Sequence, residues 1–256
     1  MIEIKSVSKS FEEKQVLKDV SCIFENGKTN LIIGRSGSGK TVMMNCIVGL
    51  MTPEHGEILY DGQDLVNMSK SQKVSLRRHM GMLFQGSALF DSMTVLENVM
   101  FPLDMFSSDS YKERKKRAQV CLDRVNLSDA ANKLPGELSG GMQKRAAIAR
   151  AIALNPKYLF CDEPNSGLDP KTSLVIDKLI YEITKENNMT TIVNTHDMNS
   201  VMGIGEHILF LYHGSKEWVG SKDEIMNSSN ERLNDFIFAS DFSKRLREAN
   251  EEERNK

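Results

Sequence analysis

The run from Gly34 to Thr41, Gly-Arg-Ser-Gly-Ser-Gly-Lys-Thr, constrains this chain more than any other feature, because it has the spacing GxxxxGK[ST]. An apolar segment, Thr29–Ile33, precedes it, and apolar residues at helical spacing follow Lys40. Glycines let such a loop curl around an anion, with its N–H groups and the next helix N-terminus facing the phosphates. The run therefore predicts a phosphate-binding loop between a buried strand and a helix.

The lysine and the threonine of this loop favour a nucleotide over a ligand-free glycine turn, which would need neither. We expect Lys40 to reach the β- and γ-phosphates of ATP and Thr41 to hold Mg²⁺ through its hydroxyl. The residues expected to bind the nucleotide in this loop are Gly34, Arg35, Ser36, Gly37, Ser38, Gly39, Lys40, Thr41 and Val42.

Two acids, Asp162 and Glu163, end a second apolar run, Tyr158–Cys161. A buried strand of an α/β protein reaches an active site at its carboxyl edge, and neighbouring strand residues point to opposite faces. The pair can therefore divide its work, with Asp162 toward the Mg²⁺ shell and Glu163 toward an attacking water. Two acids at a strand end can also be simply solvated, but a phosphate loop in the same chain favours the functional interpretation.

Composition narrows the setting of the protein. A formal net charge of −2 over 256 residues gives no field that attracts nucleic acid, so we expect no nucleic-acid partner. The four cysteines have neither CxxC spacing nor nearby histidines, which predicts reduced, mostly buried thiols in the cytosol. No apolar run is long enough to cross a bilayer, so we expect any membrane process to be served from the cytosolic side through a partner.

Short apolar runs alternate with helical patterns, which predicts an α/β fold with a mostly parallel sheet covered on both faces. The first segment, from Ile2 to Val20, is expected to be β. Strands are predicted at Thr29–Ile33, Glu57–Tyr60, Gly81–Phe84, Tyr158–Cys161, Thr190–Asn194 and His207–Leu211, and helices after Lys40 to Leu50, over Tyr111–Val125 and over Lys171–Glu186. We expect one domain over residues 1–227, with a helical subdomain inserted at about 86–156, and a helical C-terminal extension over 228–256.

Two segments leave alternatives open. The basic cluster of the helix at Tyr111–Val125 could contact anions or lipid headgroups, although a solvated helix face is favoured; its members are Lys112, Arg114, Lys115, Lys116 and Arg117. The C-terminal segment carries apolar residues at roughly helical spacing, namely Leu233, Phe236, Ile237, Phe242 and Leu246. That segment could dock on its own domain or offer an apolar face to a partner, and the sequence does not decide between them.

A family resemblance begins at Leu138-Ser139-Gly140-Gly141-Met142, which resembles the signature motif of ABC ATPases. Gln85 matches the glutamine of the family's Q-loop, Ser166–Asp169 resembles its D-loop, and His196 matches its switch histidine. Over residues 1–227 the chain resembles an ABC transporter ATP-binding protein. The resemblance implies a P-loop NTPase core of the ABC type, with an N-terminal antiparallel β portion and an inserted α-helical subdomain.

The same resemblance implies a mechanism shared between two copies of the chain. ABC ATPases dimerise head to tail, and the phosphate loop of one copy and the signature of the other enclose each ATP. Ser139, Gly140 and Gly141 would then contact the γ-phosphate across the interface. Glu163 would orient the water, and His196 would stabilise charge on the transferring phosphate, assisted by Lys40. Gln85 would join the Mg²⁺ shell and pass the nucleotide state to a membrane partner.

Phe11 matches the position of the family's aromatic residue that stacks on adenine. Tyrosine is commoner there, but phenylalanine keeps the π-face and loses only the hydroxyl. A buried core position is the alternative for Phe11, and stacking is favoured.

The segment Gln85–Leu103, together with Met142 in the signature, is similar to the ATPases of Mla-type, MCE-associated lipid transporters. Gly86-Ser87 departs from that pattern, in which the reverse order is expected, and Asn165–Asp169 is closer to the general ABC pattern. The resemblance implies two copies beneath an MlaE-like integral membrane permease, with an MCE-domain periplasmic protein beyond it. The cargo would be phospholipid moved between the two membranes of a diderm bacterium. The chain would lie peripherally on the cytoplasmic face of the inner membrane, without touching the lipid.

Three other functions compete with this one. An ABC importer or exporter of another small substrate would use the same ATPase. A soluble ABC ATPase of DNA repair or translation is disfavoured, because the chain has one cassette, no sustained heptads and no zinc spacing. A regulator that binds nucleotide without turnover is disfavoured by the presence of a complete catalytic set, Lys40, Asp162, Glu163 and His196.

Overall fold

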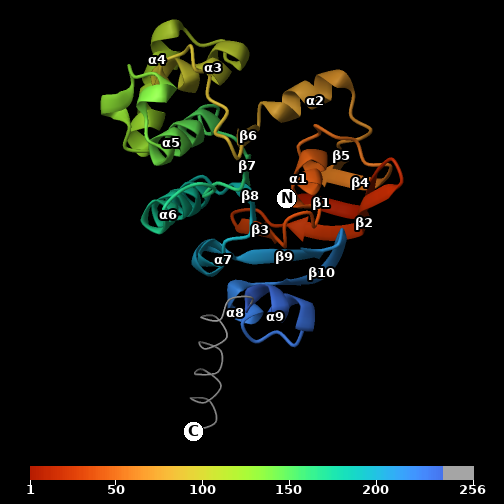
Figure 1. Ribbon diagram of the computed structural model, residues 1–256. Coiled ribbons are helices and arrows are strands. Elements are labelled where there is room, and N and C mark those ends of the chain that lie inside the picture. Colours follow the sequence, from red (N-terminus) through yellow and green to blue (C-terminus); the bar gives the residue numbers. More distant parts are fainter. Residues whose placement is uncertain (239–256) are drawn as a thin grey trace.

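The computed structural model describes residues 1–238, which form two β-sheets with helices packed around them (Figure 1). The strands are β1 Ile2–Phe11, β2 Lys14–Phe24, β3 Thr29–Ile33, β4 His55–Tyr60, β5 Gln63–Asp64, β6 Met80–Leu83, β7 Tyr158–Asp162, β8 Thr190–Thr195, β9 His207–Tyr212 and β10 Ser215–Gly220. The helices are α1 Lys40–Ile47, α2 Lys70–Arg77, α3 Val95–Phe106, α4 Tyr111–Arg124, α5 Gly140–Ala151, α6 Pro170–Glu186, α7 Met198–Ile204, α8 Lys222–Ile225 and α9 Glu231–Ile237, with 3₁₀ turns η1 Ser128–Ala130 and η2 Pro135–Glu137.

The larger sheet has the strand order β10-β9-β3-β8-β7-β6. All its neighbouring pairs are parallel except β9 with the edge strand β10. The carboxyl ends of β3, β8 and β7 therefore meet at one edge. The phosphate loop follows β3, His196 follows β8, Asp162 is the last residue of β7, and Glu163 follows it. The sheet order thus gathers motifs that lie far apart in the sequence.

Both faces of this sheet are covered, so its central strands are buried on each side. Leu31 belongs to an apolar cluster with residues of α5, α6 and α7. The next residue, Ile32, belongs to a second cluster with residues of α1 and of the smaller sheet. Alternate side chains of β3 thus enter separate cores. The smaller sheet is antiparallel, in the order β2-β1-β4-β5. The predicted α/β fold with an antiparallel N-terminal portion is confirmed.

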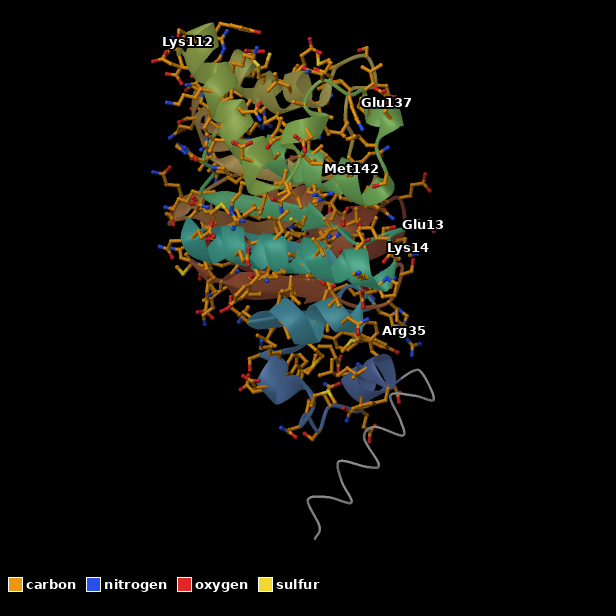
Figure 2. The ribbon with its side chains drawn as sticks, turned by 90° about the vertical axis from the view of Figure 1, so that its left-hand side faces the viewer. Glu13, Lys14, Arg35, Lys112, Glu137 and Met142 are labelled. Carbon is orange, nitrogen blue, oxygen red and sulfur yellow. The ribbon has the colours of Figure 1, made fainter. Side chains whose placement is uncertain are left out.

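Helices α3, α4 and α5 lie together at one end of the molecule, beside β6 and β7 (Figure 1). They form the helical subdomain that was expected in the middle of the chain; its limits at 86 and 156 stay predictions, as does the domain limit at 227. The basic cluster on α4 divides in two. Arg114 pairs with Asp104, and Arg117 binds carbonyl groups beyond α5. Lys112, which Figure 2 shows at the far end of this subdomain, is exposed, and so are Lys115 and Lys116.

Leu50 was expected on the apolar face of the first helix, but α1 ends at Ile47 and Leu50 is 61% exposed. Gly49, with φ +74°, turns the chain away there, as glycine commonly does after a helix.

In the C-terminal segment, Leu233 and Ile237 are buried in the apolar cluster that also contains residues of α5, α6 and α7, which favours docking for this part. Phe242 and Leu246 lie outside the described residues.

All four cysteines are buried free thiols, in agreement with the prediction. Burial raises the pKa of Cys22 to about 12 and that of Cys46 to about 11, so neither is a nucleophile near neutral pH.

Within residues 1–238, no helix has the length and apolar character that a membrane span requires.

Candidate functional site

The phosphate loop runs from β3 to α1 and needs glycine at two positions for different reasons. Gly34 has φ +150°, and a Cβ there would lie 2.4 Å from the carbonyl oxygen of Leu211. Gly39 has φ +104° and immediately precedes α1. The loop can therefore fold back over the helix N-terminus only with these residues, which leaves backbone N–H groups free for an anion.

Lys40, the first residue of α1, is buried although it carries a charge. Its Nζ donates to the carbonyl oxygen of Gly34 at 2.8 Å and lies 3.9 Å from Glu163 Oε1. Burial lowers the pKa of Lys40, and the Glu163 and Asp162 carboxylates oppose that shift. The ammonium group is thus held at the mouth of the loop, where a phosphate can replace the backbone carbonyl as its partner.

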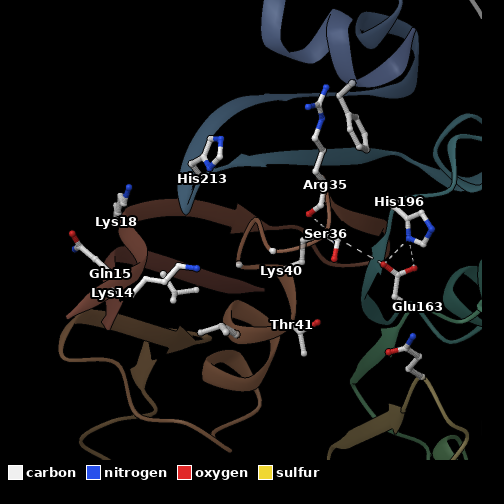
Figure 3. A pocket seen from close by; sticks show the side chains of 16 residues that line it. Lys14, Gln15, Lys18, Arg35, Ser36, Lys40, Thr41, Glu163, His196 and His213 are labelled. Carbon is white, nitrogen blue, oxygen red and sulfur yellow. Dashed lines mark hydrogen bonds and ion pairs between the residues drawn. The ribbon is translucent and has the colours of Figure 1, made fainter. Parts of the chain in front are cut away.

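Glu163 lies between two cationic or proton-carrying groups, as the dashed lines of Figure 3 show. Its carboxylate faces Lys40 on one side, and on the other it is 2.9 Å from Nδ1 of the exposed His196. The backbone of Glu163 is left-handed, with φ +46°, and its N–H donates to the carbonyl oxygen of Asn194 at 3.0 Å. The structure therefore brings together three of the predicted catalytic residues.

Gln85 reaches the same site from the segment that joins β6 to the helical subdomain. Its Nε2 donates to Oγ of Ser166 at 3.3 Å, and the N–H of Ser166 donates to the carbonyl oxygen of Glu163 at 3.1 Å. The predicted Q-loop and D-loop are thus in contact within one chain. Ser166 was expected only as part of the D-loop, and no local signal shows that it would touch Gln85.

These residues line a cavity of about 840 Å³ (Figure 3). The predicted residues Arg35, Ser36, Gly37, Gly39, Lys40, Thr41, Val42, Gln85, Glu163 and His196 are among those that line it. Gly34 and Ser38 are buried in the loop itself. The lining is completed by residues that sequence patterns did not indicate for this role: Lys14, Gln15, Val16 and Lys18 of β2, His213 of the β9–β10 turn and Phe236 of α9.

Phe11 does not line this cavity. It lies at the end of β1, is 43% exposed, and has Lys9 Nζ 5.4 Å from its ring centroid. The alternative of a core position is wrong, because a core residue would be buried. Stacking of Phe11 on adenine stays a prediction.

The signature residues line a separate cavity of about 460 Å³. Ser139 is the N-cap of α5, and its Oγ accepts from the N–H of Met142 at 3.3 Å. Gly140, Gly141 and the D-loop residues Gly167 to Asp169 share that cavity, and no residue lines both cavities. The structure thus keeps the signature away from the phosphate loop of the same chain.

The predicted Mg²⁺ ligands Thr41, Gln85 and Asp162 offer oxygen donors, which suit Mg²⁺ when nucleotide phosphates supply the other ligands. Asp162 Oδ1 accepts from Nδ2 of Asn194 at 3.0 Å. Oδ1 of Asn194 is buried and has no hydrogen-bond partner among the described residues. The unpaired Oδ1 of Asn194 lies beside the expected ligand Asp162, which fits a Mg²⁺ ion that carries water molecules. Of the described residues, no three His, Cys, Asp or Glu side chains are grouped to hold a metal.

Comparison with known proteins gives a family and several relatives. The family model described as ABC transporter matches residues 17–166. The methionine import ATP-binding protein MetN of Clostridioides difficile is 40% identical over 237 residues, which cover 93% of this chain and 74% of that protein. The intermembrane phospholipid transport system ATP-binding protein MlaF of Escherichia coli K12 is 36% identical over 237 residues, or 93% of this chain and 88% of that protein.

Solved structures agree with the family match. A dimeric structure of the bacterial ABC transporter cassette MJ0796 has a TM-score of 0.80 and 37% identity, and covers 87% of this chain and 99% of that one. The same cassette, in a dimeric post-hydrolysis state with ADP and Pi, has a TM-score of 0.79 and 36% identity with the same coverage.

Proposed function

Because this chain belongs to the ABC transporter ATP-binding proteins and hydrolyses ATP, we propose that its ATPase powers phospholipid transport between the two membranes of a diderm bacterium. The likeness to MlaF carries this proposal, since it extends over 88% of that protein. The Gln85–Leu103 segment and Met142 support it independently of overall identity.

The two separate cavities support a shared active site. In a head-to-tail pair, the 840 Å³ cavity of one copy would face the 460 Å³ signature cavity of the other, with ATP between them. Mg²⁺, held by Thr41, Asp162 and Gln85, would neutralise charge on the β- and γ-phosphates. Glu163 would orient the attacking water, because its carboxylate opens into the cavity and is braced by His196.

The transport step requires membrane partners. We place the chain peripherally on the cytoplasmic face of the inner membrane, beneath an MlaE-like permease that contacts the lipid and works with an MCE-domain protein. Two copies of the chain would serve one permease pair.

A second candidate function is ATP-driven import of a small substrate such as an amino acid. The 40% identity with MetN favours it, although the match covers less of that protein than the match with MlaF does. The ATP site would be the same in both cases, so the permease discriminates between them.

The test is purification of the chain from its native membranes in mild detergent, followed by identification of the bound membrane proteins. We expect a permease of the MCE-associated kind, and the purified complex in liposomes should transfer phospholipid when ATP is present. Glu163→Gln is the control, since it should recover the same permease without lipid transfer. Recovery of a permease for methionine or another small substrate would instead support the second candidate, and recovery of no permease at all would contradict both.

A further inference from the structure

Asn194 is a polar residue in an apolar place. It is the fifth residue of β8, follows Ile192 and Val193, and is completely buried. A buried amide is costly unless its donors and acceptor are paired. The contacts of Asn194 therefore need an explanation that packing alone does not provide.

Two of its contacts go to the acids of the active site. Its Nδ2 donates to Asp162 Oδ1 at 3.0 Å, across the register pair that Asp162 and Asn194 form between β7 and β8. Its backbone carbonyl accepts the N–H of Glu163 at 3.0 Å. One residue thus orients the predicted metal ligand through its side chain and the predicted water-orienting acid through its backbone.

The third group, Oδ1 of Asn194, has no partner among the described residues. Turning the amide over would place this oxygen against the Asp162 carboxylate, which only accepts hydrogen bonds when ionised, so the orientation with Nδ2 toward Asp162 is the stable one. Asn194 also pairs in register with Ile32, whose side chain lies in the core beneath α1. Its side chain therefore lies on the face of the sheet that α1 covers, the helix that begins with Lys40 and Thr41.

We propose that Asn194 is a positioning residue for the metal–nucleotide complex. Its Nδ2 fixes the Asp162 carboxylate, and its Oδ1 accepts a hydrogen bond from a water molecule in the Mg²⁺ shell. This assigns a use to the unpaired oxygen and to the buried amide as a whole, and it does not depend on the transported cargo.

The test compares binding of a fluorescent ATP analogue in Mg²⁺ and in EDTA, using the full-length chain. Asn194→Leu removes both the donor and the acceptor at similar volume. We expect it to lower the affinity about 10-fold in Mg²⁺, the usual scale for groups behind a metal ligand, and to leave the affinity in EDTA unchanged. The control is Thr190→Val at the other end of β8, where the hydroxyl binds Asn26 far from the acids; it should match the wild type in both conditions.

A second variant separates the two hydrogen bonds and remains informative if Asn194→Leu does not fold. Asn194→Asp keeps an acceptor and adds a negative charge beside Asp162. It should weaken binding in EDTA and show a larger gain on adding Mg²⁺ than the wild type does. The decisive quantity is the ratio of the affinity in Mg²⁺ to the affinity in EDTA. The proposal is overturned if Asn194→Leu leaves this ratio unchanged, or if Asn194→Asp does not increase it.

Discussion

At the scale of single residues, Glu163 shows how the backbone prepares a side chain. A non-glycine residue at φ +46° is uncommon and persists where its surroundings determine it. Here Asn194 holds its N–H and Ser166 holds its carbonyl group. The carboxylate is therefore presented to Lys40 and His196 by the turn itself, before any nucleotide binds.

Asp177, on α6 behind the D-loop, is a buried acid that the motifs did not indicate. It accepts from Asn165 Nδ2 at 2.8 Å. Burial raises its pKa, and hydrogen bonds from Ser200 and Asn165 oppose the shift in part. An acid whose folded pKa is raised contributes stability that is fully present below its unfolded pKa of about 3.9 and is lost as the pH rises through the folded value.

We therefore predict that Asp177→Asn makes the protein more stable at neutral pH and flattens the fall in stability from pH 4 upward. The asparagine keeps an oxygen for Asn165 but has no charge to bury. Urea unfolding at a series of pH values would measure this, with the exposed Asp129→Asn as the control. If Asp177→Asn and the wild type lose stability in parallel as the pH rises, the explanation is wrong.

At the scale of elements, α5 holds the segment after β6 in an unusual shape. Lys144 donates to the carbonyl oxygen of Gln85, and Arg150 donates to those of Ser87 and Ala88 at 2.9 and 2.6 Å. Ser87 and Ala88 have φ values of +62° and +50°. The lipid-transporter pattern has serine at 86 and glycine at 87, and glycine would adopt this conformation freely. In this chain the order is reversed, so a strained serine stands at 87, and the hydrogen bonds from α5 hold it in place.

Asn98 ties the same segment to α3. It is fully buried, its Oδ1 accepts from the N–H of Phe90, and its Nδ2 donates to the carbonyl oxygens of Phe90, Met93 and Thr94. One amide thus bonds to four backbone groups, and two of these, the carbonyl oxygens of Phe90 and Thr94, also accept backbone N–H groups. In the sequence, Asn98 was only one residue of the segment that resembles the lipid-transporter ATPases. Its hydrogen bonds depend on how the preceding segment folds over α3.

We predict that Asn98→Ala lowers the free energy of unfolding by about 2–4 kcal/mol, because the four hydrogen bonds of this buried amide are lost. Denaturant unfolding measures the change. Lys112→Ala, at an exposed position of α4, should stay within about 0.5 kcal/mol of the wild type. A loss for Asn98→Ala no larger than that of the control would contradict the proposed tie.

The same scale shows which elements the sequence could predict. The segments at β3, β7, β8 and β9 and the long helices α4 and α6 were predicted to within about two residues, because continuous apolar runs and helical periodicity are local signals. The short elements β5, α7, β10 and α8 were missed. Their few residues carry no periodic pattern, and contacts with the rest of the chain determine their conformation.

At the scale of the whole molecule, the phosphate loop and the predicted signature residues line two separate cavities of one chain. We predict that mixing two inactive variants, Lys40→Ala and Ser139→Glu, restores part of the ATPase rate. In a mixed head-to-tail pair, one site combines the intact phosphate loop of the Ser139→Glu copy with the intact signature of the Lys40→Ala copy. Turnover before and after mixing, and ATP-dependent association by size-exclusion chromatography, are the measurements. Absence of both recovery and association would reject the shared site.

The sequence by itself determined that this protein is an ATPase, because the phosphate loop, the strand-end acids and the signature are local patterns that residue type and spacing define. It predicted the family, which the family model over residues 17–166 confirmed. Only the tertiary structure decided which side chains complete the site: Asn194 against Asp162, Ser166 against Gln85, and Phe236 in the cavity lining. Such pairs come from strand order and register, which join residues far apart in the chain and leave no trace in any local pattern.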